Sequence, residues 1–172
     1  MKKISKIALV FSDTRKTDGA LKRVSQVIES SPCEITHSVN IKKLKNLDAK
    51  KIKEVQLILV LGGDGTMIGS IRHLHYLNIP FLGVNTGTVG FLTDLSIKNI
   101  DKLKEILNGS YINEKRPIYE AYSDRRKKEI FLNEVVIHSG SVTKMLNLEL
   151  SLKDQVIYNL KADGLIISSS TG

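Results

Sequence analysis

Hydrophobic residues in the first half of the chain form short apolar runs that alternate with segments of helical spacing. The runs predict strands and the segments between them predict helices. The predicted strands are 6–12, 33–39, 56–61 and 81–85, and the predicted helices are 18–30, 41–55 and 66–77. Such alternation is typical of an α/β fold with a doubly wound, mostly parallel sheet, in which the fully apolar run at 56–61 is a central strand.

The pattern changes after about residue 98. One more helix is expected at 99–109, and the remaining segments alternate between apolar and polar residues, as strands do. Two of these strands should form a hairpin whose charged tip, 124–128, is a solvated turn. We therefore expect an α/β domain at 1–98 and a β-rich second domain at 99–172.

Composition narrows the class of protein. The 172 residues are 41% hydrophobic and 26% charged, as expected of a globular protein, and no apolar run approaches the ~20 residues of a membrane helix. The single cysteine, Cys33, fits a reducing compartment, so a cytoplasmic location is expected. The net charge of +8 is spread along the chain with few aromatics, which favours steering of an anionic small substrate over nucleic-acid binding.

A glycine-rich turn, LGGDGT, follows the predicted central strand. Gly62, Gly63 and Gly65 would lie at the carboxyl end of the sheet, where open α/β folds bind ligands. Thr66 can cap the next helix, whose N-terminal N–H groups suit a phosphate. The Walker pattern is absent, because no Gly-Lys-Ser/Thr follows.

Asp64 places a carboxylate inside this predicted phosphate loop. A carboxylate beside a phosphate is repulsive unless Mg²⁺ bridges the two, or unless the carboxylate takes a proton from a hydroxyl that attacks the phosphate. Both explanations indicate a kinase. The simpler alternative is an Asp-Gly turn with no chemistry.

Two further stretches carry candidate residues. In NTGTVGFLTD, after the fourth predicted strand, Asn85 and its glycine neighbours Gly87 and Gly90 are expected near a ligand, whereas Phe91 and Leu92 are expected in the core. Asn133 and Glu134 interrupt the apolar strand EIFLNEVVIH and need polar partners if buried. A dinucleotide could supply these partners, and so could an internal network.

The stretch GGDGT resembles the signature shared by NAD kinases, diacylglycerol-type lipid kinases and, more loosely, phosphofructokinases. Three more stretches resemble NAD kinase motifs in order and spacing: GVNTGTVGFLTDL, NEVVIHSG and ADGLIISSSTG. The resemblance covers nearly the whole chain. In NAD kinases many residues follow the Thr-Gly of the last motif, so an incomplete, sandwich-like second domain is expected.

The resemblance implies transfer of the terminal phosphoryl group of ATP, or of polyphosphate, to the 2′-hydroxyl of the adenosine ribose of NAD. Asp64 would be the general base, Mg²⁺ would assist, and the enzyme would be a homo-oligomer. No metal ligand is assigned. The residues expected to bind NAD or the phosphoryl donor are Gly62, Gly63, Gly65, Thr66, Asn85, Asn133, Glu134, Lys144, Lys161, Asp163 and Thr171.

Two other functions stay open at this point. One is a catalytically impaired chain that binds nucleotide or associates with full-length subunits. The other is a lipid kinase that uses the same GGDGT loop, which the NEVVIHSG and ADGLI stretches disfavour.

Overall fold

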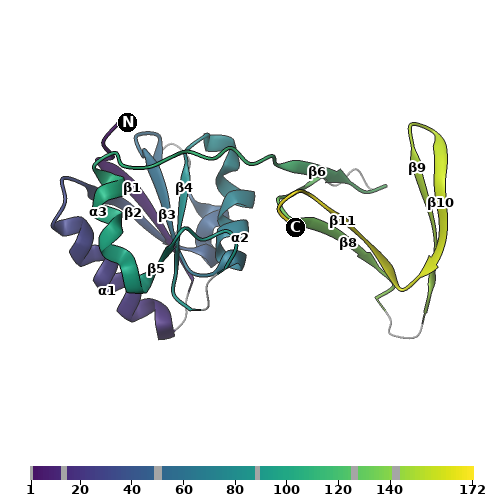
Figure 1. Ribbon diagram of the computed structural model, residues 1–172, viewed down its shortest axis with the longest axis horizontal. Helices are drawn as coiled ribbons and strands as arrows, with labels where there is room; N and C mark the ends of the chain where they lie inside the picture. Colours follow the sequence, from purple (N-terminus) through teal and green to yellow (C-terminus); the bar gives the residue numbers. More distant parts are fainter. Residues whose placement is uncertain (1, 13–14, 49–51, 88–89, 125–127, 141–143) are drawn as a thin grey trace. The chain divides into compact units, whose positions relative to one another are not determined.

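The computed structural model describes residues 2–12, 15–48, 52–87, 90–124, 128–140 and 144–172. The chain forms two compact units, Met1–Lys115 and Arg116–Gly172 (Figure 1). The first unit is an α/β layer structure, and the second consists of small antiparallel sheets. This arrangement confirms the predicted fold class.

The first unit is built on a five-stranded parallel sheet in the order β2-β1-β3-β4-β5. Its strands are β1 (Lys6–Phe11), β2 (Glu34–Asn40), β3 (Leu57–Leu61), β4 (Phe81–Asn85) and β5 (Leu95–Ser96). Its α-helices are α1 (Arg15–Glu29), α2 (Asp64–Leu74) and α3 (Leu103–Leu107), and 3-10 helices cover Ile41–Asn46, His75–Leu77 and Ile97–Lys102. All five residues of β3 are buried, as predicted for a central strand.

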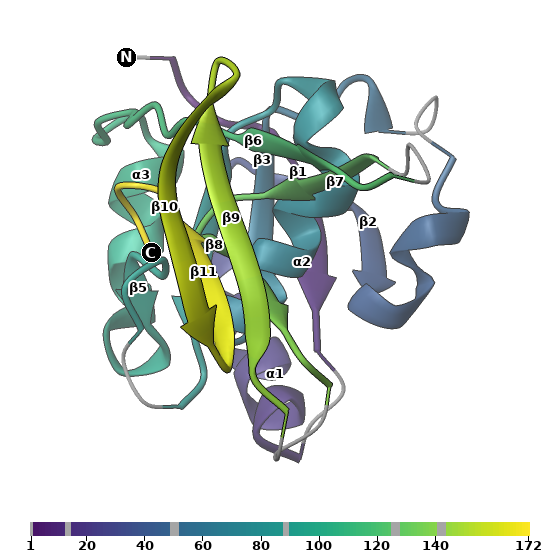
Figure 2. The ribbon, with the colours of Figure 1, turned by 90° about the vertical axis from the view of Figure 1, so that its right-hand side faces the viewer.

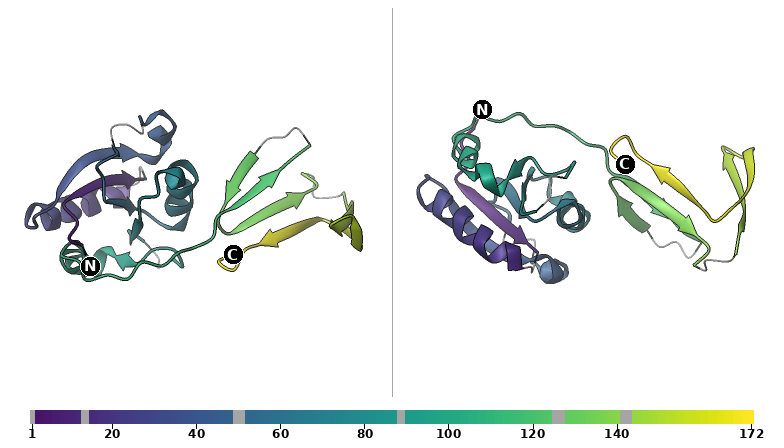
Figure 3. Two further views of the ribbon diagram at one scale, coloured as in Figure 1. Left: turned by 90° about the horizontal axis from the view of Figure 1, so that it is seen from above. Right: turned by 60° about the horizontal axis from the view of Figure 1, so that its bottom comes forward.

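Helices cover both faces of this sheet. Alternate residues of β1 and β3, such as Ile7 and Leu59, share a core cluster with Val24 of α1 and Leu103 of α3. Figure 3 shows α1 running along this face. The opposite face carries α2, which packs on β3, β4 and the 3-10 helix Ile41–Asn46. Burial of each large aliphatic side chain contributes roughly 1.5–3 kcal/mol.

The helix predicted at 41–55 is not present. The structure has a 3-10 helix at Ile41–Asn46, which begins where the Asn40 side chain accepts the backbone N–H of Lys42. It ends at Leu47, which is extended, and residues 49–51 of the predicted helix lie outside the described residues. Leu44, Ile52 and Val55, whose spacing suggests one helix, are each buried. They pack into the core without belonging to one continuous helix.

The structure places the helix expected at 99–109 in the first unit. It begins with a capping box between Ser96 and Asn99, continues as a 3-10 helix, and ends as α3. Its side chains Ile100, Leu103 and Leu107 are buried in the same cluster as α1. Gly109 follows with φ of 102°, the positive φ that favours glycine at a helix end.

The described residues of the second unit form three antiparallel strand pairs, β6–β7, β8–β11 and β9–β10, and Figure 2 shows β9 and β10 as the longest pair. The strands are β6 (Tyr119–Tyr122), β7 (Lys128–Phe131), β8 (Glu134–His138), β9 (Leu146–Leu152), β10 (Gln155–Ala162) and β11 (Gly164–Ser168). The β6–β7 hairpin confirms the prediction, although tip residues 125–127 lie outside the described residues. In the described part of this unit, Leu132 is the one buried hydrophobic residue.

Candidate functional site

The first glycine-rich turn joins β3 to α2 at the carboxyl end of the sheet. Gly62 donates its N–H to Val84 O at 3.0 Å, which ties the turn to the neighbouring strand β4. A Cβ on Gly62 would lie 2.4 Å from Thr66 Oγ1 and 2.7 Å from Thr66 Cβ, so the turn closes tightly because residue 62 has no side chain. The turn therefore brings the start of α2 to the edge where parallel sheets bind ligands.

The predicted cap at Thr66 is wrong. Helix α2 begins at Asp64, and Gly63 is the N-cap residue. Thr66 lies in the first turn, where its N–H donates to Gly63 O at 2.9 Å. Because glycine has no capping side chain, the first N–H groups of α2 have no side-chain partner at the cap.

Asp64 connects the two glycine-rich loops. Its Oδ2 accepts the backbone N–H of Phe91 at 2.8 Å, and its Oδ1 accepts that of Leu92 at 3.1 Å. A carboxylate with two backbone donors is a strong, directed contact. Asp64 is therefore more than a turn residue, since it holds a loop that lies 27 residues away in sequence.

Gly90 makes this contact possible. A Cβ at residue 90 would lie 2.1 Å from Asp64 Oδ1 and 2.4 Å from Cγ. Real Cβ atoms do not approach other atoms so closely, so the carboxylate fills space that any side chain on residue 90 would take.

Asn85 is buried at the end of β4, with 2% of its surface exposed. Its Nδ2 donates to Thr93 Oγ1 at 3.1 Å, and its Oδ1 accepts the N–H of Gly87 at 2.7 Å. Both ends of the Asn85 amide group thus stabilise the glycine-rich loop that follows β4. Contact of Asn85 with a ligand stays a prediction.

Phe91 and Leu92, the two apolar residues of the GFL stretch, differ in burial. Leu92 is 7% exposed and packs inside, as predicted, whereas Phe91 is 96% exposed, so its predicted place in the core is wrong. The backbone N–H groups of both residues point to Asp64. This fixed turn directs only Leu92 inward and leaves an aromatic ring in solvent beside the Asp64 loop.

In the second unit, Asn133 lies between two strands rather than within one. Strand β7 ends at Phe131 and β8 begins at Glu134. The Asn133 Oδ1 atom is buried and has no hydrogen-bond partner among the described residues, whereas Glu134 is exposed. A buried acceptor without a donor costs about 1–3 kcal/mol. This cost marks Asn133 as a position where a ligand donor would be favourable.

The segment at 169–172 is tied to the residues just before β8. Ser169 N–H donates to Asn133 O at 2.7 Å, and Ser169 Oγ donates to Leu132 O at 2.5 Å. Thr171 Oγ1 donates to the same Leu132 carbonyl at 3.0 Å. The structure thus brings together Asn133 and Thr171, two residues that the sequence assigns to the dinucleotide.

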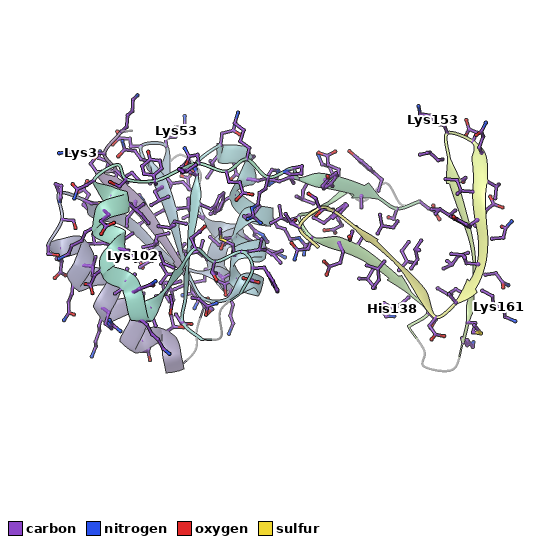
Figure 4. The ribbon with its side chains drawn as sticks, viewed as in Figure 1. Lys3, Lys53, Lys102, His138, Lys153 and Lys161 are labelled. Carbon is purple, nitrogen blue, oxygen red and sulfur yellow. The ribbon has the colours of Figure 1, made fainter. Side chains whose placement is uncertain are left out.

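The remaining predicted residues lie on the surface of the second unit. Lys144 is exposed just before β9. Lys161 is exposed on β10, opposite Asn147, and is labelled in Figure 4. Asp163 is exposed between β10 and β11, and its carbonyl accepts the N–H of Ser139. The roles of these three side chains stay predictions.

The acidic side chain at the phosphate loop suits Mg²⁺ only in the binding mode that uses few protein ligands. Among the described residues, no group of three or more His, Cys, Asp or Glu side chains lies together to hold a metal ion. Mg²⁺ commonly binds through one or two carboxylates plus nucleotide phosphates and water. A single carboxylate at the phosphate loop, Asp64, fits that mode. No helix within the described ranges has the length and apolarity to span a membrane.

The sequence does not point to Thr93 or Ser169. Thr93 and Ser169 are hidden because each acts through a hydrogen bond to a residue that is distant along the chain. Gly90 is expected near a ligand, and in the structure it leaves room for the Asp64 carboxylate. Its proximity to a ligand stays a prediction.

Comparison with known proteins shows the family to which the chain belongs. The family model described as the ATP-NAD kinase N-terminal domain matches residues 7–111, and the ATP-NAD kinase C-terminal domain model matches 132–172. The NAD kinase of Salmonella enteritidis is 39% identical over 145 residues, covering 81% of this chain and 50% of the relative. That of Hahella chejuensis is 36% identical over 141 residues, covering 79% and 46%. The chain spans about half the length of these relatives.

Solved structures show the same fold. Yeast NADH kinase complexed with NADH matches with a TM-score of 0.73 at 19% identity, covering 99% of this chain and 56% of that one. A diacylglycerol kinase from Bacillus anthracis matches with a TM-score of 0.59 at 16% identity, covering 96% and 64%. Since the N-terminal family model alone matches more than half of the sequence, the chain belongs to the NAD kinase family.

Proposed function

We propose that the chain transfers the terminal phosphoryl group of ATP to the 2′-hydroxyl of the adenosine ribose of NAD, which yields NADP and ADP. Membership of the NAD kinase family supports the substrates. One observation carries the chemistry: Asp64 lies at the N-terminus of α2, at the carboxyl end of β3, with its carboxylate held by two backbone N–H groups. Polyphosphate is an alternative phosphoryl donor for the same reaction.

Asp64 acts as the general base in this proposal. A carboxylate has about four lone-pair positions, and Phe91 N–H and Leu92 N–H use two of them. The free positions can accept the proton of the 2′-hydroxyl while its oxygen attacks the terminal phosphorus. The bond to the bridging oxygen of ATP then breaks, and ADP leaves with that electron pair.

The start of α2 receives the phosphates. Cβ atoms built on Gly63 and Gly65 would meet nothing within 4 Å, so the backbone here is open to a ligand. The uncapped N–H groups and the positive end of the helix dipole favour an anion. Mg²⁺, held mainly by the phosphates and assisted by Asp64, would neutralise charge as the phosphoryl group moves.

The second unit supplies the contacts to NAD. The unpartnered Oδ1 of Asn133 would accept an N–H of the adenine or the carboxamide, and Glu134 would accept from ribose hydroxyls. Lys144 and Lys161 would neutralise pyrophosphate, and Asp163 and Thr171 would contact the dinucleotide. We also propose a cytoplasmic homo-oligomer.

A second candidate is nucleotide binding without turnover. Leu132 is the one buried hydrophobic residue in the described part of the second unit, and single small sheets are marginally stable alone. A unit with so small a core would bind NAD without holding it in one fixed position for phosphoryl transfer. In this case the chain would bind nucleotide or associate with full-length subunits.

An assay on the purified chain separates the candidates. The chain is incubated with NAD, ATP and Mg²⁺, and NADP is measured with a dehydrogenase that accepts only NADP. Sustained NADP formation supports the kinase and contradicts the binding-only candidate. NAD binding without NADP formation supports the binding-only candidate and contradicts the kinase. Transfer of labelled phosphate from ATP to diacylglycerol, and not to NAD, would contradict both and identify a lipid kinase.

A further inference from the structure

The hydrogen bonds of Ser169 surround one residue of the second unit. Its N–H donates to Asn133 O at 2.7 Å, and its Oγ donates to Leu132 O at 2.5 Å. These two carbonyls belong to the two peptide groups on either side of the Asn133 Cα. One residue therefore fixes the peptide plane before Asn133 and the peptide plane after it.

Fixing both planes fixes a side-chain direction. The plane before a Cα sets φ and the plane after it sets ψ, so together they determine where the Cβ points. The neighbouring Leu132 is 2% exposed and anchors the same segment. The Asn133 side chain thus leaves the backbone in one direction and carries its unpartnered Oδ1 with it.

The hydroxyl of Ser169 also contacts Thr171. Besides donating to Leu132 O, it accepts the N–H of Thr171 at 3.0 Å and lies 2.9 Å from Thr171 Oγ1. Replacing Ser169 by alanine would remove the acceptor for Thr171 N–H and one of the donors to Leu132 O. The peptide plane before Asn133 would then rely on Thr171 Oγ1 alone.

We propose that Ser169 is a positioning residue that sets the direction of the Asn133 amide and, resting on the proposed function, sets the affinity for NAD. It touches no substrate itself. Its neighbour Ser170 is exposed and offers a matched control within the same run of serines. Ser169→Thr keeps the hydroxyl and serves as the conservative variant.

Two measurements on the full chain test the proposal. The first is the NMR signal of the Asn133 side-chain amide without ligand, which should shift in Ser169→Ala and stay in place in Ser170→Ala. The second is the dissociation constant for NAD, which should rise about fivefold in Ser169→Ala, since one hydrogen bond contributes roughly 1 kcal/mol. It should return to within about threefold in Ser169→Thr, while ATP binding stays unchanged in every variant.

Each outcome has a distinct meaning. An unmoved Asn133 signal in Ser169→Ala overturns the positioning role. A moved signal with unchanged NAD affinity limits Ser169 to a structural role and overturns the link to NAD. Absence of NAD binding in the unmodified chain contradicts the proposed function, and the NMR comparison then decides the positioning role by itself.

Discussion

The carboxylate of Asp64 lies 2.1 Å from the place where a Cβ on Gly90 would stand. These residues belong to different glycine-rich loops, one after β3 and the other after β4. The contact joins the two loops at the edge of the parallel sheet, so that each restrains the position of the other. It also means that the position of the proposed base depends on a residue that carries no functional group.

Gly90→Ala tests this dependence. The new methyl group should expel the Asp64 carboxylate, which would lose the N–H groups of Phe91 and Leu92. Loss of such charge-assisted bonds should destabilise the first unit by about 2 kcal/mol in urea denaturation. Gly19→Ala is the control, because a Cβ there meets nothing within 4 Å and alanine in helix α1 should stabilise by about 0.5–1 kcal/mol. Equal stability of the Gly90→Ala variant and the unmodified chain would show that the Asp64 carboxylate does not depend on the space left by the missing side chain of residue 90.

Gly62→Ala tests the closure of the first turn. Its methyl group would press on the side chain of Thr66, with 2.7 Å to Cβ, so the start of α2 must move. Overpacking of this kind costs about 1–3 kcal/mol, measured as a shift of the denaturation midpoint.

Gly65→Ala offers the matched comparison for stability. Residue 65 lies in the first turn of α2 with open space around it, so the unfolding free energy should change by less than about 0.5 kcal/mol. Equal losses in the two variants would contradict the contact with Thr66 as the cause of the loss in Gly62→Ala.

Burial makes Cys33 a slow nucleophile. It raises the pKa of the thiol, so at about pH 8 the folded chain holds less thiolate than the unfolded chain. Iodoacetamide should therefore alkylate the folded chain several-fold more slowly than the chain in urea. The two rates should converge as the pH rises beyond the raised pKa. Equal rates at the lower pH would contradict the shift.

Elements whose apolar side chains pack locally on the sheet could be predicted. The run 56–61 is recognisable as a central strand because it is apolar on both faces, and β3 is fully buried. The segment 41–55 misleads because its apolar spacing resembles one helix. In the structure Leu44, Ile52 and Val55 are anchored separately, and a single-sequence pattern does not distinguish these cases.

The candidate site is only partly predictable for a different reason. The residue types of GGDGT indicate phosphate chemistry, since glycine and a helix start are local features. The partners of Asp64 are backbone N–H groups of another loop. A sequence does not indicate which backbone N–H groups a distant side chain will contact. The same holds for Ser169, whose role depends on two carbonyls that lie far away along the chain.

The most direct test of the account is the rate of NADP formation by the unmodified chain and by Asp64→Asn, measured beside NAD binding. The amide keeps one acceptor oxygen for the loop N–H groups and is a poor proton acceptor, so kcat should fall at least about a hundredfold while NAD affinity changes little. If Asp64→Asn forms NADP at the rate of the unmodified chain, then Asp64 is not the base and the central claim is wrong.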